Sequence, residues 1–384
     1  MAQSWDLRHS SAGVLSILFR FANQLLRLRG HSAGMTLKQK IIGAGLAVGR
    51  TPGVARLAPS SVRGLGAILM FHHVRPWADD AYSPNRELEI TPEFFGDVIQ
   101  LLRRLGWIVV SLDEAVQRVK AGKSDRPFAA LTFDDGYRDN FAWALPVIER
   151  EKAPMTLFVA SGFMNRSACL WWLDIEEAIR RAAIIDVSPN GHRIAMECAT
   201  AAQKERTALR LLDILRQSPQ DEVDRIANDL AHLYRFDRRE RVDSLCLDAK
   251  EVAQIATHPL VSIGAHTRTH PMLATVSLER ARGEIVAAKA ELETLIGKPV
   301  RHFAYPIGDA RNAGPREFLL AREAGYASAL TIRPGMLFAE HAEHLTALPR
   351  LSINGRFQSI RDVEFLLSGL PFAMWNRFRR VNAA

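Results

Sequence analysis

The chain has 384 residues, of which 48% are apolar and 24% charged, a balance typical of a soluble globular protein. The net charge of +8 is confined to residues 1–63, which hold nine Lys or Arg and a single acidic residue, so the rest of the chain carries no net charge. The basic charge therefore does not predict a catalytic region that binds nucleic acid. The three cysteines form no C-x-x-C pair, which argues against a disulfide framework and favours a reducing, cytoplasmic compartment.

Residues 1–63 are expected to form a basic N-terminal arm and linker. The apolar spacing over residues 13–28 predicts an amphipathic helix that, with Arg20 at its centre, is too short and too charged to span a bilayer. Such a helix can lie on an anionic membrane, so residues 13–29 are a candidate for peripheral contact with the inner membrane surface. The alternatives are a helix packed on the body and an arm with little order, and Met35 is a second candidate start.

Strand and helix patterns alternate through most of residues 64–355. The predicted strands cover residues 67–71, 107–110, 127–133, 155–159, 260–265, 302–305, 327–331 and 348–353. The predicted helices between them include residues 112–119, 139–151, 278–296 and 315–324. This alternation predicts an α/β fold with a closed parallel barrel. Residues 163–257 interrupt the alternation with a helical pattern and are expected to be an insertion, and residues 356–384 are expected to be a basic, aromatic tail.

Charged and metal-binding residue types follow two of the predicted strands. One strand ends in the adjacent carboxylates Asp134 and Asp135, which repel each other and cannot be buried unpaired, although a plain Asp-Gly turn is the alternative. A later strand ends in His266 and His270. One Asp with two His makes an open, catalytic kind of metal site and leaves the other Asp free for proton transfer.

Three motifs, TFDDG at residues 132–136, HTRTH at residues 266–270 and FAYPIG at residues 303–308, resemble those of the NodB-homology polysaccharide deacetylases, carbohydrate esterase family four. The resemblance implies a distorted (β/α) barrel and metal-dependent removal of N- or O-linked acetyl groups from sugars. By position it makes Asp134 the catalytic base and Asp135, His266 and His270 the metal ligands. Zn²⁺ is the expected ion, with Co²⁺ or another divalent ion as the alternative.

The implied mechanism assigns further residues. The backbone N–H of Ile307, after Pro306, is expected to stabilise the oxyanion. Relatives with the fuller third motif carry an Arg where this chain has Ala304 and Tyr305. We therefore expect Arg350 to orient Asp134, the alternative being a purely structural strand Arg.

Four residues are candidates for contact with the substrate. They are Tyr305, Pro306, Trp171 and Trp172. The Trp pair could stack on sugar rings, but a pair at the start of a helix is more often part of a core.

The family's late Leu-x-Leu-His motif is missing, so another residue must supply the leaving group with a proton. The first predicted strand ends in His72 and His73, and in a closed barrel the first and last strands are neighbours. This resembles the permuted motif order of deacetylases that act on poly-N-acetylglucosamine. By that match His72 is the general acid and His73 alternates to the other side of the strand. The alternative is that both histidines merely pack at a strand end.

The metal-site pattern together with the family resemblance implies a metal-dependent hydrolase of acetyl groups on N-acetylated sugars or polysaccharides, such as chitooligosaccharides or poly-N-acetylglucosamine. A hydrolase of the same fold acting on another amide, a formyl group or an O-acetyl ester is an alternative. A catalytically silent carbohydrate-binding protein is a second, disfavoured because both Asp and both His of the motifs are present. The expected partner is a carbohydrate and not a nucleic acid, and the oligomeric state is left open.

Overall fold

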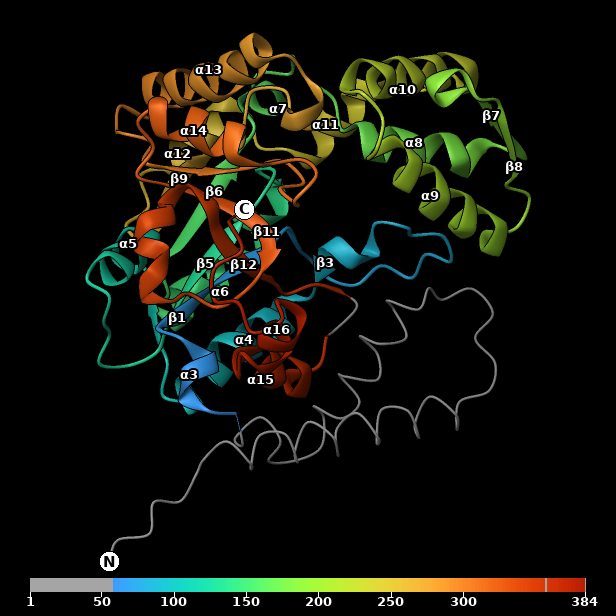
Figure 1. The fold of residues 1–384 in the computed structure, drawn as a ribbon. Coiled ribbons are helices and arrows are strands. Elements are labelled where there is room, and N and C mark those ends of the chain that lie inside the picture. Colours follow the sequence, from blue (N-terminus) through green and yellow to red (C-terminus); the bar gives the residue numbers. More distant parts are fainter. Residues whose placement is uncertain (1–57, 356–357, 384) are drawn as a thin grey trace, which may run out of the picture.

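The computed structural model describes residues 58–355 and 358–383, and within these ranges seven parallel strands pair in a closed ring (Figure 1). Strand β1 (Gly66–Phe71) closes the ring, because it pairs with β5 (Phe128–Phe133) on one side and with β12 (Leu348–Ser352) on the other. The remaining members of the ring are β6 (Met155–Val159), β9 (Val261–Ala265), β10 (His302–Ala304) and β11 (Ser328–Pro334).

The barrel is distorted where β5 has two neighbours on one side. Strand β4 (Ile108–Val110) pairs with residues 128–130, the first half of β5, whereas β6 pairs with residues 131–133, the second half. Strand β4 therefore lies outside the closed ring as an added edge strand. The predicted fold, a distorted (β/α) barrel, is confirmed.

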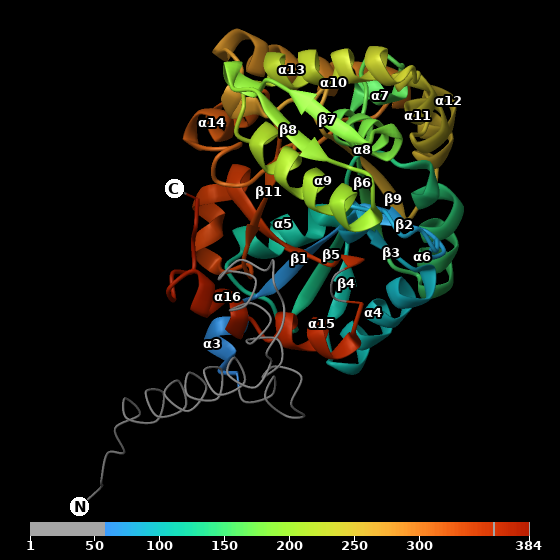
Figure 2. The ribbon, with the colours of Figure 1, turned by 90° about the vertical axis from the view of Figure 1, so that its right-hand side faces the viewer.

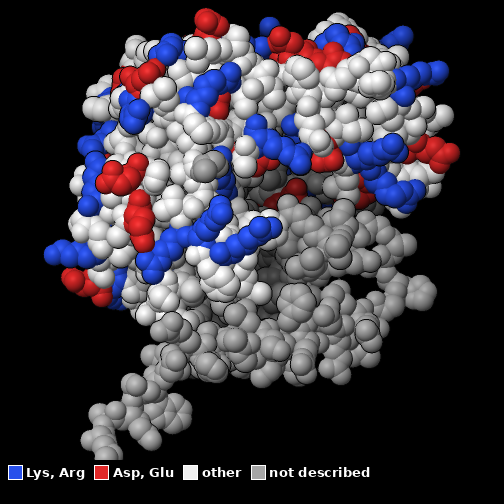
Figure 3. All heavy atoms as spheres, in the orientation of Figure 1, with Lys and Arg blue, Asp and Glu red and all other residues white. Residues whose placement is uncertain are grey.

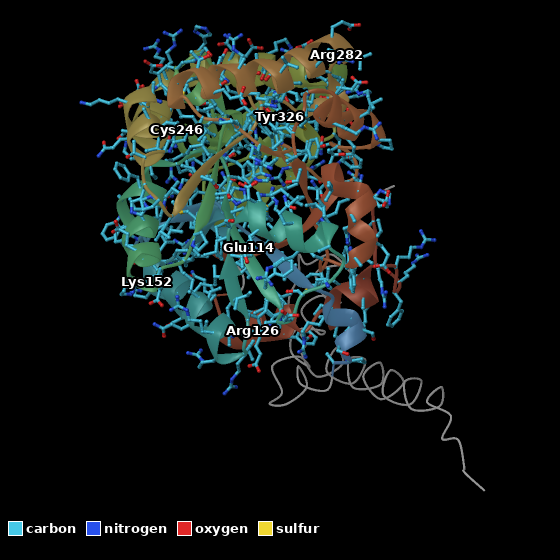
Figure 4. All side chains as sticks on the ribbon, turned by 90° about the vertical axis from the view of Figure 1, so that its left-hand side faces the viewer. Glu114, Arg126, Lys152, Cys246, Arg282 and Tyr326 are labelled. Atoms are coloured by element: carbon cyan, nitrogen blue, oxygen red, sulfur yellow. The ribbon has the colours of Figure 1, made fainter. Side chains whose placement is uncertain are left out.

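Every residue of β1 and β5 is buried, as expected for parallel strands covered by helices. The covering helices are α4 (Pro92–Arg104), α5 (Leu112–Lys120), α6 (Leu145–Glu151), α12 (Ala249–Ile255), α13 (Leu278–Ile296) and α14 (Pro315–Glu323). Figure 2 shows them around the strands, and in Figure 4 the charged ends of Arg126, Lys152 and Arg282 lie on the outer surface.

Local chemistry sets the helix ends. Helix α4 begins after Thr91, whose Oγ1 accepts the N–H of Phe94 at 3.2 Å, and Pro92 occupies the first helical position. Helix α13 begins after a similar Ser277 cap and ends at Gly297 with φ 63°, a left-handed conformation that glycine adopts without strain. Its bounds agree with the predicted ones.

The insertion between β6 and β9 is mostly helical, as its pattern predicts, and lies beside the barrel (Figure 1). Its helices are α7 (Ser161–Met164), α8 (Trp171–Arg181), α9 (Ala201–Leu215), α10 (Gln220–Tyr234) and α11 (Arg238–Leu245). They share a hydrophobic core that is separate from that of the barrel. An antiparallel hairpin of β7 (Ile184–Val187) and β8 (Ile194–Glu197) was not predicted.

The residues after 357, expected as a tail, form two helices, α15 (Ile360–Leu367) and α16 (Leu370–Trp375). Val363, Leu367 and Phe372 are buried in the barrel's hydrophobic cluster, so this segment packs on the body. Shorter elements are α3 (Ser60–Arg63), β2 (His73–Val74), β3 (Glu89–Ile90), the π-helix η3 (Asn140–Ala144) and the 3₁₀ helices η2 (Arg86–Leu88), η4 (Pro189–Gly191), η5 (Leu273–Thr275) and η6 (Ala339–Ala347).

The predicted arm helix and Met35 lie outside the described residues. Among the helices of residues 58–355 and 358–383, none is both long enough and apolar enough to cross a bilayer. Basic and acidic side chains are interspersed over the face seen in Figure 3, in agreement with the balanced charge of the chain beyond residue 63.

Candidate active site

The candidate site lies at the carboxyl ends of the barrel strands. Asp134 and Asp135 follow β5, His266 follows β9, and His72 follows β1. Because the strands are parallel, these ends meet on one side of the barrel, where barrel enzymes hold their active residues.

Asp135, His266 and His270 form a compact, buried group. The Asp135 Oδ1 atom lies 3.4 Å from His266 Nε2 and 3.3 Å from His270 Nε2, and the three potential ligand atoms lie within 4.8 Å of one another. The Nδ1 of His266 is 2.7 Å from the carbonyl of Ala304. If that nitrogen carries the proton, the Nε2 lone pair faces the group, as in a metal-ligating histidine.

The donor set fits a divalent cation. Asp135 Oδ1 is buried and has no hydrogen-bond partner among the described residues, and such an atom is costly unless a cation or a donor compensates it. Burial raises the pKa of Asp135, but the imidazoles of His266 and His270 outweigh burial and hold the pKa well below its usual range. A carboxylate with two imidazoles, leaving open positions, suits Zn²⁺ and similar ions.

The backbone at this site is held in unusual conformations. Asp135 (φ 72°), Thr267 (φ 62°), His270 (φ 58°) and Ile307 (φ 59°) all occupy the left-handed region, which costs free energy for residues other than glycine. Strain of this kind persists where the surroundings fix it, and here it coincides with the strand ends that carry the metal-ligand candidates.

Glu284 of α13 helps to fix the loop that carries both histidines. Its Oε2 accepts the backbone N–H groups of Arg268 at 2.9 Å and Thr269 at 2.7 Å. The loop is also closed internally, because Thr267 Oγ1 accepts the N–H of His270 at 3.0 Å. Sequence reasoning missed Glu284. The available signal was a carboxylate on the apolar face of a helix, next to Ile285.

Asp134 is held by a buried arginine from the last strand. Arg350 Nη1 and Nη2 donate to the two oxygens of Asp134 at 2.7 Å each, and Arg350 Nε donates to the carbonyl of Thr331 at 2.9 Å. Burial raises the pKa of Asp134, but the charge of Arg350 leads the opposing influences, which bring the pKa below its ordinary value. Asp134 is therefore an ionised carboxylate that can accept a proton near neutral pH.

His72 and His73 have different surroundings. His73 Nδ1 lies 2.6 Å from Asp139 Oδ2, and its ring stacks on Tyr137 at 3.6 Å between centroids. His72 is half-buried, and burial lowers its pKa, while Asp135 and then Asp134 act in the opposite direction. Of these two histidines, His73 is thus engaged by Asp139 and Tyr137, whereas His72 lies in the field of the carboxylates Asp135 and Asp134.

The structure does not bring Tyr305 into the site. Its ring is fully buried between Phe303 and Phe318, and its hydroxyl donates to the carbonyl of Thr346 at 2.7 Å. The expectation that Tyr305 contacts the substrate is wrong, because the residue after β10 faces the core.

Neither Trp of the pair is an exposed stacking surface. Trp171 and Trp172 are 3% and 6% exposed and belong to the core of the insertion, so the core interpretation holds. Trp172 nevertheless packs on His270, with 4.6 Å between ring centroids. The insertion thus supports a metal-ligand candidate directly.

The turn after β10 carries the expected oxyanion donor. Pro306 is buried, and its carbonyl accepts the N–H of Gly308 at 2.6 Å. The N–H of Ile307 donates no hydrogen bond to any described residue. His341 is fully buried beside Phe338, and its Nδ1 accepts the backbone N–H of Phe338. His341 therefore takes no part in the site.

The chain is similar to known proteins in sequence and in fold. Residues 121–328 match the family model described as "Polysaccharide deacetylase". The fold is similar to that of the deacetylase PplD of Streptococcus pyogenes, solved with acetate, at 17% identity and TM-score 0.52 over 78% of this chain and 96% of that one. It is also similar to IcaB of Ammonifex degensii, at 16% identity and TM-score 0.51 over 79% and 98%. No curated protein sequence gives a significant match.

Proposed function

Because the chain belongs to the polysaccharide deacetylase family, we propose that it removes acetyl groups from N-acetylated sugars in a glycan by metal-dependent hydrolysis. The observation that carries this proposal is that two adjacent carboxylates have different surroundings. Asp134 is paired with Arg350, whereas Asp135 lies beside two imidazoles with a buried oxygen that lacks a hydrogen-bond donor among the described residues. One carboxylate is thus arranged for proton transfer and the other for a cation.

Asp135, His266 and His270 would hold the metal, with Zn²⁺ as the first candidate and Co²⁺ or another divalent ion as the alternative. A bound divalent ion supplies Lewis acidity that polarises an acetyl carbonyl. The His270 ring is kept in position by Trp172, and the backbone of its loop is kept in position by Glu284.

Proton transfers are assigned to the chain's own residues. Asp134 accepts the proton of the attacking water, and Arg350 keeps that carboxylate ionised and fixes its orientation. The N–H of Ile307 donates to the oxygen that gains negative charge as the carbonyl carbon becomes tetrahedral. His72 then donates a proton to the leaving amine nitrogen, which could not depart as an anion.

The sugar substrate is proposed to be a chitooligosaccharide or a poly-N-acetylglucosamine chain. The reason is that the motif order resembles that of deacetylases acting on poly-N-acetylglucosamine. Acetate release from a panel of N-acetylated and O-acetylated sugars, each with and without a chelator, tests this proposal. We expect release from N-acetylated sugars that stops on chelation and returns with added Zn²⁺ or Co²⁺. Release from O-acetyl esters alone would instead support the esterase alternative, and no release from any sugar would overturn the proposal.

A further inference from the structure

His72 is a single residue between two strands, and its imidazole makes no hydrogen bond to any described residue. Strand β1 ends at Phe71 and β2 begins at His73. With no hydrogen bond to orient it, the His72 ring takes its position from the packing around it and from the backbone on either side. The side chains that hold this backbone come from the segment that follows Asp134 and Asp135.

Asn140 holds the backbone of His72 itself. Its Nδ2 donates to the carbonyl of His72 at 2.7 Å and to Oδ1 of Asp139 at 3.1 Å. Both partners are acceptors, so this side-chain atom is the amide nitrogen and not the amide oxygen. Asn140 is fully buried, where a hydrogen bond is stronger than in water and a lost partner is costly. The amide therefore fixes the position of the His72 carbonyl.

Asp139 holds the next two residues. Its Oδ1 accepts the backbone N–H of Val74 at 3.2 Å, and its Oδ2 lies 2.6 Å from Nδ1 of His73. The other contact of the His73 ring is the stack on Tyr137, with 3.6 Å between centroids. Each of residues 72–74 is thus bound by a side chain of residues 137–140.

The same segment also carries the two carboxylates of the candidate site. The backbone N–H of Asp134 donates to the carbonyl of Phe71 at 3.0 Å, so contacts run continuously between residues 71–74 and residues 134–140. One short stretch of chain therefore sets the candidate base, a metal-ligand candidate and the backbone of the candidate acid relative to one another. Fixed geometry of this kind is what lets several groups act on one bound substrate.

The helix that begins at Asn140 starts with a π turn. The N–H of Leu145 donates to the carbonyl of Asn140, five residues earlier, instead of four as in an α-helix. Pro146 follows and has no N–H to donate. Single π turns are frequent at functional sites. The turn at Asn140 therefore agrees with a role of this residue in the site.

We propose that Asn140 and Asp139 are positioning residues for the general acid. By holding the backbone on both sides of His72, they keep its imidazole turned toward the nitrogen that leaves. This inference rests on the proposed function, which it deepens by naming what fixes the proton donor. It also gives His73 a place beside the site, as a partner of Asp139 and not as an acid.

The test separates a loss of proton donation from a general loss of structure. Asn140→Ala removes the amide, and Asp139→Ala, at a side chain that is 12% exposed, is a second variant with less risk to folding. Asn85→Ala is the matched control, because Asn85 is also buried and its Nδ2 donates to Glu176 at 2.7 Å. Turnover, KM and metal per chain are measured on the metal-loaded protein. The substrates are an N-acetylglucosamine tetrasaccharide and 4-nitrophenyl acetate, whose phenolate leaves without a proton.

We expect Asn140→Ala and Asp139→Ala to keep their metal and their KM and to lose about 10- to 100-fold in turnover on the tetrasaccharide, the scale on which a misplaced group costs rate. Their turnover on the aryl ester should stay near that of the wild type. Asn85→Ala should match the wild type on both substrates. Equal losses on both substrates, or an equal loss in Asn85→Ala, would overturn the inference.

A double variant tests whether Asn140 acts through His72. Adding Asn140→Ala to His72→Ala should lower turnover on the tetrasaccharide by less than about twofold, because the group that Asn140 positions is already gone. A further loss as large as the one that Asn140→Ala causes alone would show that Asn140 acts by another route, and the inference would be wrong.

Failure of the proposed function would look different. A wild type that releases no acetate from any sugar would overturn that function. Crystal structures of the wild type and of Asn140→Ala or Asp139→Ala then decide the positioning role. A His72 ring displaced in the variant would support that role, and an unmoved ring would overturn it.

Discussion

The guanidinium of Arg350, in the last barrel strand, donates a hydrogen bond to each carboxylate oxygen of Asp134 at 2.7 Å. Arg350 belongs to β12 and Asp134 follows β5, and β1 lies between these two strands where the barrel closes. Both side chains are buried. In the sequence the two residues are 216 positions apart, so only closure of the barrel brings them together. The pairing explains how an ionised carboxylate can be kept inside the protein, because a buried charge is tolerated only with a partner.

Weakening this pair should move the acid limb of the pH–rate profile. In Arg350→Lys a single ammonium replaces the two-pronged contact, so less attraction opposes the burial that raises the pKa of Asp134. Asp134 acts as a base only when ionised, so activity should fall off at a higher pH than in the wild type. An acid limb that stays at the wild-type pH would mean that Arg350 does not control Asp134.

The metal site predicts the outcome of replacing its histidines. His266→Ala and His270→Ala each remove one of three ligands and should lower the divalent metal per chain, measured by elemental analysis of the purified protein. Loss of a residue that only supports a metal ligand costs about 10- to 100-fold in metal affinity, and loss of a ligand itself should cost at least as much. His258→Ala, a half-buried histidine paired with Glu149 away from the site, is the control. Full metal content in both site variants would refute the ligand assignment.

The two adjacent histidines should respond differently. His72→Ala should keep its metal and fold but lose about 10²-fold or more in turnover, with the alkaline limb of the pH–rate profile altered, as expected on loss of a general acid. His73→Ala should have a milder effect, because His73 is paired with Asp139 and stacked on Tyr137. Equal losses in both variants, or a larger loss in His73→Ala, would refute the assignment of His72.

His341 should make folding sensitive to acid. Burial lowers the pKa of His341 from 6.5 to about 4, so as the pH falls below 6.5 the unfolded chain takes up this proton before the folded chain does. The stability associated with a neutral His341 is complete above pH 6.5 and is lost as the pH falls toward 4, by about 3 kcal/mol in all.

The matched variant for this effect is His341→Asn. Its Oδ1 can accept the N–H of Phe338 as the imidazole Nδ1 does, and it has no charge to titrate. Denaturant unfolding at several pH values should show a shallower fall in stability for the variant between pH 6.5 and 4. Parallel curves for the two proteins would show that His341 does not titrate on unfolding.

The sequence predicts the barrel and the chemical groups of the site because both depend on local signals. Strand–helix alternation is visible in apolar spacing, and Asp134, Asp135, His266 and His270 stand out as polar residues at the ends of apolar strands. The pairing of Arg350 with Asp134 was also predictable, since the carboxylate needed a cation and the third motif lacked one.

Other features of the fold and the site depend on tertiary packing, which leaves no signal in the nearby residues of a single sequence. The strand before Tyr305 is buried throughout, so alternation along it does not indicate which way Tyr305 points. The hairpin of β7 and β8 has only four residues in each strand, too few for a clear period of two. Glu284 belongs to the site only because α13 packs against the loop between β9 and η5, a tertiary relationship.

The central claim is that one carboxylate of the pair holds the metal and the other accepts the proton. Asp134→Asn tests it most directly, with acetate release from an N-acetylglucosamine tetrasaccharide and metal per chain measured on the same preparation. We predict wild-type metal content with turnover lower by about 10²-fold or more, the contribution of a general base. Turnover near the wild-type level, or loss of the metal together with the activity, would contradict the division of roles between Asp134 and Asp135.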